Sequence, residues 1–156
     1  AFGNLECALT GDIITRNVRQ GPNQWFCFKT PPKYGLSLVK GEIDVVSLAN
    51  NHSMNGGEKG ILEMIKTLSK LGIVYVGGGE NYEEAHELKV IEAKGFKVGF
   101  LAYTEIGNQV AGKNKPGIAK FDKNIFSEII EAKKKIEILI VSLHWGIEGA
   151  FEPIKD

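Results

Sequence analysis

The segment DVVSLANNHSMNGG, residues 44–57, decides how this chain folds. Its first part, Val45 to Ala49, is short, apolar and rich in β-branched residues, which is typical of a strand buried on both faces. The run ends in Asn50, Asn51 and His52, and glycines follow. Such residues are common in loops and helix caps. Asparagine and histidine at the end of a buried strand can also be metal ligands. Both interpretations, a loop or cap and a metal site, are open at this point.

Strands and helices alternate on both sides of this segment. Helical periodicity runs from Gly57 to Leu71, and Gly72 ends it. A second amphipathic segment, Asp122–Lys135, begins at Asp122 as a helix N-cap and has an apolar side formed by Ile125, Phe126, Ile129, Ile130 and Ile136. Further strands are expected at the N-terminus and at residues 73–79, 89–93, 97–105 and 137–146, with short helices at 34–40 and 81–87. The alternation predicts an α/β fold of mostly parallel strands, plus one hairpin at 89–105.

Length and composition set broad limits. The 156 residues, 43% of them hydrophobic, suit a single domain over residues 1–156. The zero net charge gives no general attraction for nucleic acid, and no run of about 18 apolar residues predicts a membrane span. Cys7 and Cys27 form either one disulfide in an oxidising compartment or two free thiols in a reducing one. The abrupt first and last residues indicate a fragment truncated at both ends.

Polar clusters follow three of the expected strands. The first strand ends at Asn4 and Glu6, the second at Asn51 and His52, and the last at His144, with Glu148 close behind. In open α/β sheets, ligands bind beyond the carboxyl ends of the strands. If the strands are parallel neighbours, Glu6, Asn51, His52 and His144 converge on one edge. A carboxylate, a carboxamide and imidazoles suit Zn, Mn or Fe better than Ca or Mg.

Several other residues have simpler interpretations. His86 lies among glutamates and is expected to be exposed. The glycine run Gly77–Gly79 lacks both the Walker spacing and the dinucleotide fingerprint, so we interpret it as a tight strand-to-helix turn. A third hypothesis, that the chain is a generic α/β nucleotide-binding domain, is supported by this glycine run alone. The aromatic residues Trp25, Phe26 and Phe28 are expected in the core, and a contact surface is the alternative.

Three stretches, which cover most of the chain, together resemble a known family: GNLECALT (3–10), the long segment 28–85 that contains SLANNH, and VSLHWGIEGAFEP (141–153). They are similar, in sequence and order, to bacterial capsule-synthesis proteins of the CapA type, which are associated with poly-γ-glutamate capsule. The resemblance implies a calcineurin-like metallophosphoesterase fold, in which two metals sit at the strand ends of a β-sandwich flanked by helices.

Carried over residue by residue, the resemblance assigns roles. It makes Glu6 a bridging carboxylate ligand, Asn51 a carboxamide ligand and His144 a further metal ligand. His52 becomes the non-ligand histidine, which donates to a leaving group or polarises the scissile group. Asn4, Asn50 and Glu148 become supporting or substrate contacts.

The implied function is capsule biosynthesis with a metal-dependent hydrolase or phosphoesterase-like site. The substrate would be a phosphoester or an anionic γ-glutamyl polymer, and membrane-bound capsule synthase proteins would be partners. The expected location is the outer side of the bacterial cytoplasmic membrane, with the anchor outside this chain, although a cytoplasmic location stays open. The alternative is a non-catalytic, polymer- or partner-binding component of a capsule-assembly complex.

The chain also departs from the family pattern. The family's Gly-Asp element would precede Ala1, and its Gly-His-x-Pro-His element would follow Asp156. Asn55 stands where Asp is usual, and Gly149 stands where Tyr is usual. The chain is therefore expected to hold about half of a binuclear site, because a metal site needs its full ligand count.

Overall fold

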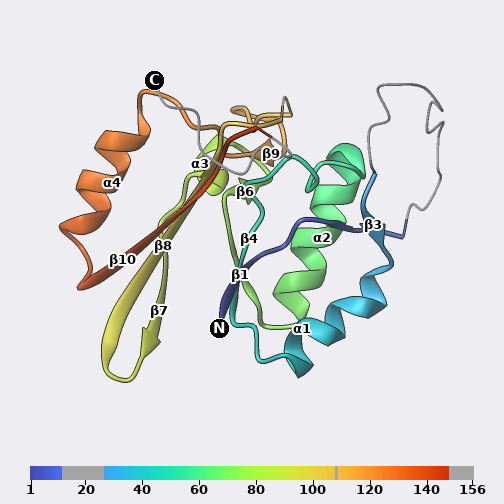
Figure 1. The fold of residues 1–156 in the computed structure, drawn as a ribbon, viewed down its shortest axis with the longest axis horizontal. Coiled ribbons are helices and arrows are strands. Elements are labelled where there is room, and N and C mark those ends of the chain that lie inside the picture. The colour runs from blue at the N-terminus through green and yellow to red at the C-terminus, as the bar shows by residue number, and fades with distance from the viewer. Residues whose placement is uncertain (12–26, 108, 148–156) are drawn as a thin grey trace.

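The computed structural model describes residues 1–11, 27–107 and 109–147 of the chain. Two three-stranded sheets form its centre (Figure 1). The first sheet is wholly parallel and contains β1 (Phe2–Asn4), β4 (Val45–Ser47) and β5 (Val74–Val76), in the order β1-β4-β5. The second contains β10 (Ile138–His144), β8 (Phe96–Thr104) and β7 (Lys89–Ala93), in the order β10-β8-β7. Strand β10 runs parallel to β8, whereas β7 and β8 form the expected antiparallel hairpin.

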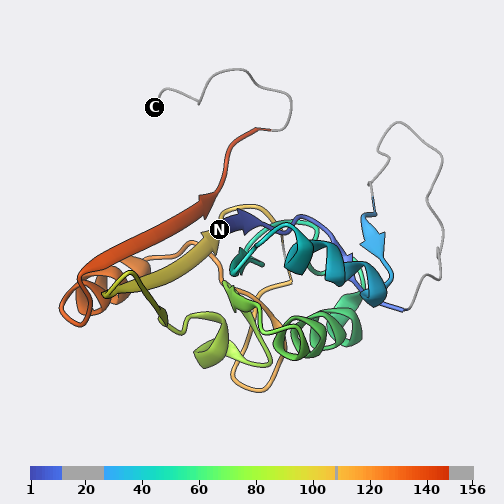
Figure 2. The same ribbon diagram turned by 90° about the horizontal axis from the view of Figure 1, so that it is seen from below.

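Side-chain alternation along the strands defines four layers. On β8, Phe100 and Ala102 pack toward Val45 and Val76 of the first sheet, whereas Leu101 and Tyr103 belong to the cluster beneath the helix α4 (Ile125–Lys133). Successive side chains of a strand point to opposite faces, so each sheet has one face on the other sheet and one on a helix. Figure 2 shows α2 and α4 on opposite outer sides of the two sheets. The order of the layers is helix, sheet, sheet, helix.

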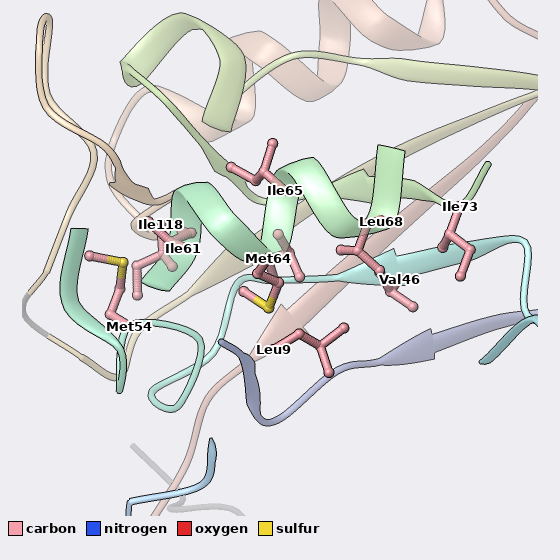
Figure 3. Packing of buried hydrophobic residues seen from close by; sticks show 10 residues of the cluster. Leu9, Val46, Met54, Ile61, Met64, Ile65, Leu68, Ile73 and Ile118 are labelled. Carbon is pink, nitrogen blue, oxygen red and sulfur yellow. The ribbon is translucent and has the colours of Figure 1, made fainter. Parts of the chain in front are cut away.

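Helix α2 (Gly57–Lys70) covers the outer face of the first sheet. Its buried side chains recur at helical spacing, as the sequence predicts. They are Ile61, Met64, Ile65 and Leu68. In Figure 3, Met64 and Leu68 lie beside Val46 of β4 and Leu9 of β2 (Ala8–Leu9), and Ile61 lies beside Met54 and Ile118. This packing anchors the turn that precedes α2, which carries Asn50 to Asn55.

Smaller elements complete the fold. They are β3 (Lys29–Thr30), the 3₁₀ helix η1 (Pro32–Gly35), α1 (Leu36–Lys40), β6 (Gly78–Gly79), α3 (Tyr82–Ala85) and β9 (Gly117–Ile118). Strand β2 pairs with β3 in parallel, and β6 pairs with β9 in antiparallel orientation. The sequence did not predict the short strands β2 and β9, and the strand expected at 73–79 is divided into β5 and β6. The mixed α/β class with mostly parallel strands and one hairpin is confirmed.

The glycine run after β5 is explained by close packing. Gly77 has a φ of +76°, and a Cβ there would lie 2.6 Å from the Cβ of Ala49 and 2.8 Å from the carbonyl oxygen of Ala102. Only glycine fits this conformation and this space without strain. The run lets the chain pass between the two sheets on its way to β6 and α3, so its glycines need no phosphate ligand to explain them.

The expected exposure is wrong for two side chains of α4. Phe126 and Ile130 of α4 were expected on its buried side, but both are exposed, because the helix begins at Ile125 and faces β8 and β10 with Ile125, Ile129 and Ala132. The expected N-cap at Asp122 is wrong, because Asn124 is the residue that precedes the helix; the Asp122 side chain accepts the backbone N–H of Asn124 (2.7 Å) in the turn before it.

His86 was expected in solvent, but its side chain is only 5% exposed. Its Nδ1 lies 3.0 Å from Oε2 of Glu128, which also accepts the hydroxyl of Tyr103 at 2.8 Å. Its Nε2 is buried and has no hydrogen-bond partner among the described residues. Burial, followed by the Glu128 hydrogen bond, raises the pKa of Tyr103 above its ordinary range. This network ties α3, β8 and α4 together.

The cysteines Cys7 and Cys27 are both free, the first half-buried and the second exposed. Among the described residues, no helix is long and apolar enough to cross a membrane.

Candidate functional site

The parallel pairing of β1 and β4 brings two of the predicted polar clusters together. Asn4 lies opposite Ser47 in the register, so the residues that follow each strand emerge side by side. The backbone N–H of Leu5 donates to the carbonyl of Ser47 (3.0 Å), which continues the pairing past the end of β1. The Asn4 side chain donates to Oε2 of Glu6 (3.1 Å). The carboxylate of Glu6 is therefore oriented at the edge of the sheet, as expected from the sequence.

Asn50 connects the two strand ends. Its side chain is 0% exposed. Its Nδ2 donates to Oδ1 of Asn4 (2.9 Å) and to the carbonyl of Leu5 (3.0 Å). Its Oδ1 accepts the backbone N–H groups of His52 (3.0 Å) and Ser53 (2.8 Å), and also the Ser53 hydroxyl (3.0 Å). A buried side chain with these bonds holds the backbone rather than a substrate, so direct substrate contact, one of the two roles predicted for Asn50, does not fit its position.

His144 reaches the same place from the second sheet. It is the last residue of β10 and pairs with Thr104 of β8 in the register. Its carbonyl accepts the Thr104 hydroxyl (3.1 Å) and the backbone N–H of Glu105 (3.0 Å), which fixes the end of the strand. Its Nε2 lies 3.0 Å from Oδ1 of Asn51 and 3.8 Å from Oε1 of Glu6. The predicted convergence therefore occurs, but across two sheets rather than along one.

His52 lies beside this group in a separate environment. Its Nδ1 is 3.0 Å from Oδ1 of Asn55, and the same oxygen accepts the backbone N–H of Phe28 (2.7 Å). The ring of Phe28 packs on the imidazole, with the two ring centres 4.3 Å apart. Phe28, expected in the core, is exposed and belongs to this site. No sequence pattern predicts this contact, because β3, η1, α1 and β4 all lie between Phe28 and His52 in the chain.

A cavity of about 360 Å³ joins these residues. Glu6, Asn51, His52 and His144 all line it, and Trp145 forms part of its wall. A smaller hollow of about 180 Å³ adjoins it and shares His144 and Trp145. Four of the predicted site residues thus face one space large enough for a ligand.

The donor atoms can be compared with the spacing that a divalent metal requires. Two ligands bound to one Zn at about 2.0–2.2 Å lie roughly 2.8–3.6 Å apart in tetrahedral or octahedral geometry. The separation from His144 Nε2 to the Asn51 oxygen falls in that range, and the separation to Glu6 lies just beyond it. Among the described residues, no group of three or more His, Cys, Asp and Glu side chains is arranged to hold a metal. The candidate set therefore depends on the carboxamide of Asn51 as its third member.

The remaining predicted residues are placed as follows. Asn4 is exposed and orients Glu6, so it acts on the site through that carboxylate. Glu148 lies outside the described residues, as do Trp25 and Phe26. Burial raises the pKa of the Cys7 thiol, which favours the protonated form and argues against a thiolate ligand there.

The fold and site together define a class. Two mostly parallel sheets lie between helices, and acidic, carboxamide and imidazole side chains gather at their strand ends, an arrangement consistent with a metallophosphoesterase-like fold. The bacterial capsule synthesis protein family, PGA_cap, matches residues 1–156. The chain belongs to this family.

Curated relatives agree with this assignment. The PGA biosynthesis protein CapA of Bacillus subtilis (strain 168) is 32% identical over 113 residues, covering 70% of this chain and 30% of that protein. The capsule biosynthesis protein CapA of Bacillus anthracis is 29% identical over 116 residues, covering 70% and 28%. A probable polyglutamine synthesis accessory protein of Mycobacterium tuberculosis is 28% identical over 163 residues, covering 92% and 40%. The matched part is thus well under half the length of each relative.

Proposed function

We propose that this chain is part of a capsule (poly-γ-glutamate) biosynthesis protein with a metal-dependent hydrolase site at Glu6, Asn51 and His144. One observation carries the proposal: His144 Nε2 lies 3.0 Å from the Asn51 oxygen and 3.8 Å from the Glu6 carboxylate. These residues come from three strand ends in two sheets, far apart in sequence. Family membership and the names of the CapA relatives support the capsule role.

The chemistry follows from the donor set. A Zn, Mn or Fe ion, when bound, supplies a Lewis acid that polarises a phosphoryl or acyl oxygen. In this proposal Glu6 provides negative charge, Asn51 a neutral oxygen and His144 an unprotonated nitrogen. Because His144 must be neutral to bind a metal, metal binding weakens in acid. His52 lines the same cavity and handles a proton of the substrate or of water.

The substrate in this proposal is a phosphoester or an anionic γ-glutamyl polymer. A second metal and further ligands would come from the rest of the longer protein, since the matched relatives are more than twice as long as the part aligned here. We place the whole protein on the outer side of the bacterial membrane, beside membrane-bound capsule synthase proteins, and expect no nucleic-acid partner.

Elemental analysis of purified protein tests the metal site directly. We expect a bound divalent ion in the wild type after reconstitution with Zn, Mn or Fe, and its loss in Glu6→Ala, Asn51→Ala and His144→Ala. Glu92→Ala is the matched control, because Glu92 is an exposed carboxylate on β7, outside the cavity. A longer form of the protein is measured in parallel. Absence of metal from both forms after reconstitution would refute the hydrolase proposal, whereas its presence justifies a screen of phosphoesters and γ-glutamyl peptides.

A non-catalytic binding role is the second candidate. Trp145 and Ile147 are 62% and 60% exposed and line the same cavity, so they offer apolar contacts to a polymer or a partner protein. In that case poly-γ-glutamate binds without added metal, and Glu6→Ala leaves the affinity unchanged. Metal-dependent binding that Glu6→Ala abolishes would favour the enzyme.

A further inference from the structure

The loop that follows β8, residues 105–107, forms part of the wall of the larger cavity. Its first backbone N–H donates to the carbonyl of His144 (3.0 Å), and its middle residue, Ile106, lines the cavity. Its last residue, Gly107, lies against Asn51, because a Cβ built on Gly107 would be 3.5 Å from the Cα of Asn51. The 105–107 loop therefore contacts both Asn51 and His144, whose side chains meet across the two sheets at 3.0 Å.

One side chain holds this loop closed. Lys120 lies beside the end of β8, where it pairs with Thr104 in a parallel bridge. Its ammonium donates to two carbonyl oxygens of the loop, those of Glu105 and of Gly107, the second at 2.9 Å. A lysine ammonium has three donors and no acceptor, so it can bond both carbonyls at once. No other described residue donates to either carbonyl, so the two ends of the loop are joined through this ammonium.

The other bonds of the loop hold its middle rather than its end. The buried hydroxyl of Thr104 accepts the backbone N–H of Ile106 (3.0 Å). It also faces the carbonyls of Ile106 (2.8 Å) and His144 (3.1 Å), but a hydroxyl has one hydrogen and donates it to one of them at a time. Among the described residues, only Lys120 bonds the last carbonyl of the loop, so the end that meets Asn51 depends on it.

Neither an ion pair nor a ligand explains Lys120. Within the described ranges it forms no ion pair with a carboxylate. It lines neither the larger cavity nor the smaller hollow beside it. The side chain is half-buried, and both of its hydrogen bonds to described residues go to the loop. A strongly hydrated ammonium that bonds only backbone carbonyls stabilises the chain around it rather than a charge on the surface.

We propose that Lys120 is a positioning residue: its ammonium holds the 105–107 loop against Asn51, and through the loop it sets the separation of Asn51 from His144. Without the ammonium, the carbonyl of Gly107 turns toward water, and the loop moves away from the Asn51 backbone. Asn51 then loses a neighbour that fixes it opposite His144. The consequence for metal binding rests on the proposed hydrolase function, whereas the consequence for the loop and for Asn51 does not.

Backbone ¹⁵N relaxation of metal-free protein measures the first step, the rigidity of the loop. We expect order parameters at Ile106 and Gly107 to fall from about 0.85 in the wild type to below about 0.6 in Lys120→Met, which removes the donors but keeps a long apolar side chain. Lys120→Arg restores a cationic donor and is expected to return them toward the wild-type value. Lys115→Met is the matched control, because Lys115 is exposed on the turn before β9, outside both cavities.

The side-chain amide signal of Asn51 in the same metal-free protein measures the second step. We expect its ¹⁵N and ¹H shifts to change in Lys120→Met, to return toward wild type in Lys120→Arg, and to stay unchanged in Lys115→Met. Gly72→Ala is a further control, because it is expected to lower stability but lies outside the cavity. It shows whether lost stability alone moves the signal.

Metal affinity measures the consequence for the proposed hydrolase. Titration against a competing chelator is expected to give an affinity about 10-fold lower in Lys120→Met, as for other residues that support metal ligands, and near the wild-type value in Lys120→Arg. A wild type that binds no metal would refute the hydrolase and leave the Asn51 signal to decide the role of Lys120. Unchanged metal affinity in Lys120→Met would overturn the effect of Lys120 on the site while leaving the hydrolase intact.

Two results in metal-free protein would overturn the proposal outright. One is a rigid loop in folded Lys120→Met, and the other is a loosened loop with an unmoved Asn51 signal. If the methionine variant does not fold, the wild type decides. Scalar couplings are expected across the hydrogen bonds from the Lys120 ammonium to the carbonyl carbons of Glu105 and Gly107, and their absence would overturn the proposal.

Discussion

Replacing Asn50 by alanine is expected to destabilise the protein strongly, although Asn50 does not line the cavity. Its side chain is fully buried and bonds to both strand ends of the first sheet. Two of the bonds run from its NH₂ group to Asn4 and Leu5, and three run to its oxygen from His52 and Ser53. Alanine removes all of these bonds at once and supplies no substitute.

The magnitude follows from the partners. A hydrogen bond contributes about 0.5–1.5 kcal/mol net, and a buried polar group left without a partner costs about 1–3 kcal/mol. Ser53 is fully buried, so its N–H and hydroxyl lose their acceptor away from water. The other partners are at least partly accessible and regain some hydration. We therefore expect a loss of about 3–5 kcal/mol, a large part of the 5–15 kcal/mol typical of a domain.

Urea denaturation, followed by circular dichroism, measures this loss. Asn4→Ala is the matched control, because Asn4 is exposed and shares only one bond with Asn50; we expect a loss below about 1 kcal/mol there. Asn50→Asp keeps the accepting oxygens but buries a charge beside the Leu5 carbonyl, so its stability should improve as pH falls and the carboxyl is protonated. A loss below about 1 kcal/mol for Asn50→Ala, similar to that of Asn4→Ala, would refute the reasoning.

Three further outcomes are expected. Gly77→Ala should lower the free energy of unfolding by about 2–5 kcal/mol, because it adds backbone strain and overpacking. Gly72 also has a positive φ (+71°), but a Cβ there would have no atom within 4 Å, so Gly72→Ala should lower it by only about 1 kcal/mol. Urea denaturation of both variants measures the difference. Tyr103→Phe should lose about 1.5–3 kcal/mol at neutral pH, since its hydroxyl bonds the Glu128 carboxylate. Because burial raises the pKa of Tyr103, the stability that its hydroxyl contributes is fully present below about pH 10 and is lost as the pH rises further. Above pH 10 the denaturation midpoint should therefore fall less steeply with pH in Tyr103→Phe than in the wild type. Parallel curves for the two proteins would contradict this. Metal at 100 times its Kd should stabilise the wild type by about 2.7 kcal/mol in a thermal melt and leave His144→Ala unchanged; an equal shift in both would place the metal elsewhere.

Local patterns predicted most of the elements. The β-branched run at Val45–Ser47 and the helical spacing of Ile61, Ile65 and Leu68 each specify one element without knowledge of distant residues. The hairpin at β7 and β8 follows from a turn between two apolar runs, and its Lys94 and Gly95 both have positive φ. Such features are readable because each depends on neighbours in the chain. The very short strands β2 and β9 were missed because two residues are too few to show a periodic pattern.

Contacts between segments that are far apart in the sequence could not be predicted from it. Nothing near Phe28 in sequence shows that its backbone meets Asn55, and nothing near His86 shows that Glu128 lies beneath it. Exposure was misjudged for the same reason: Phe126 has the spacing of a buried residue, but the face it occupies on α4 lies away from the sheet. Asn50 and Asn51 are neighbours of the same type, yet one is a buried connector and the other lines the cavity. Only the tertiary structure separates their roles.

The geometry of the site depends on how the two sheets pack, because its ligands are divided between them. Asn51 and Glu6 follow strands of the first sheet, whereas His144 ends a strand of the second. The sheets are held by a core in which Val45 and Val76 meet Phe100 and Ala102, and Gly77 allows the closest approach. A shift of one sheet on the other would separate His144 from Asn51 without altering either strand. The side chains between the sheets would therefore determine the geometry of the proposed metal site as directly as its own residues do, since close-packed interiors transmit such displacements.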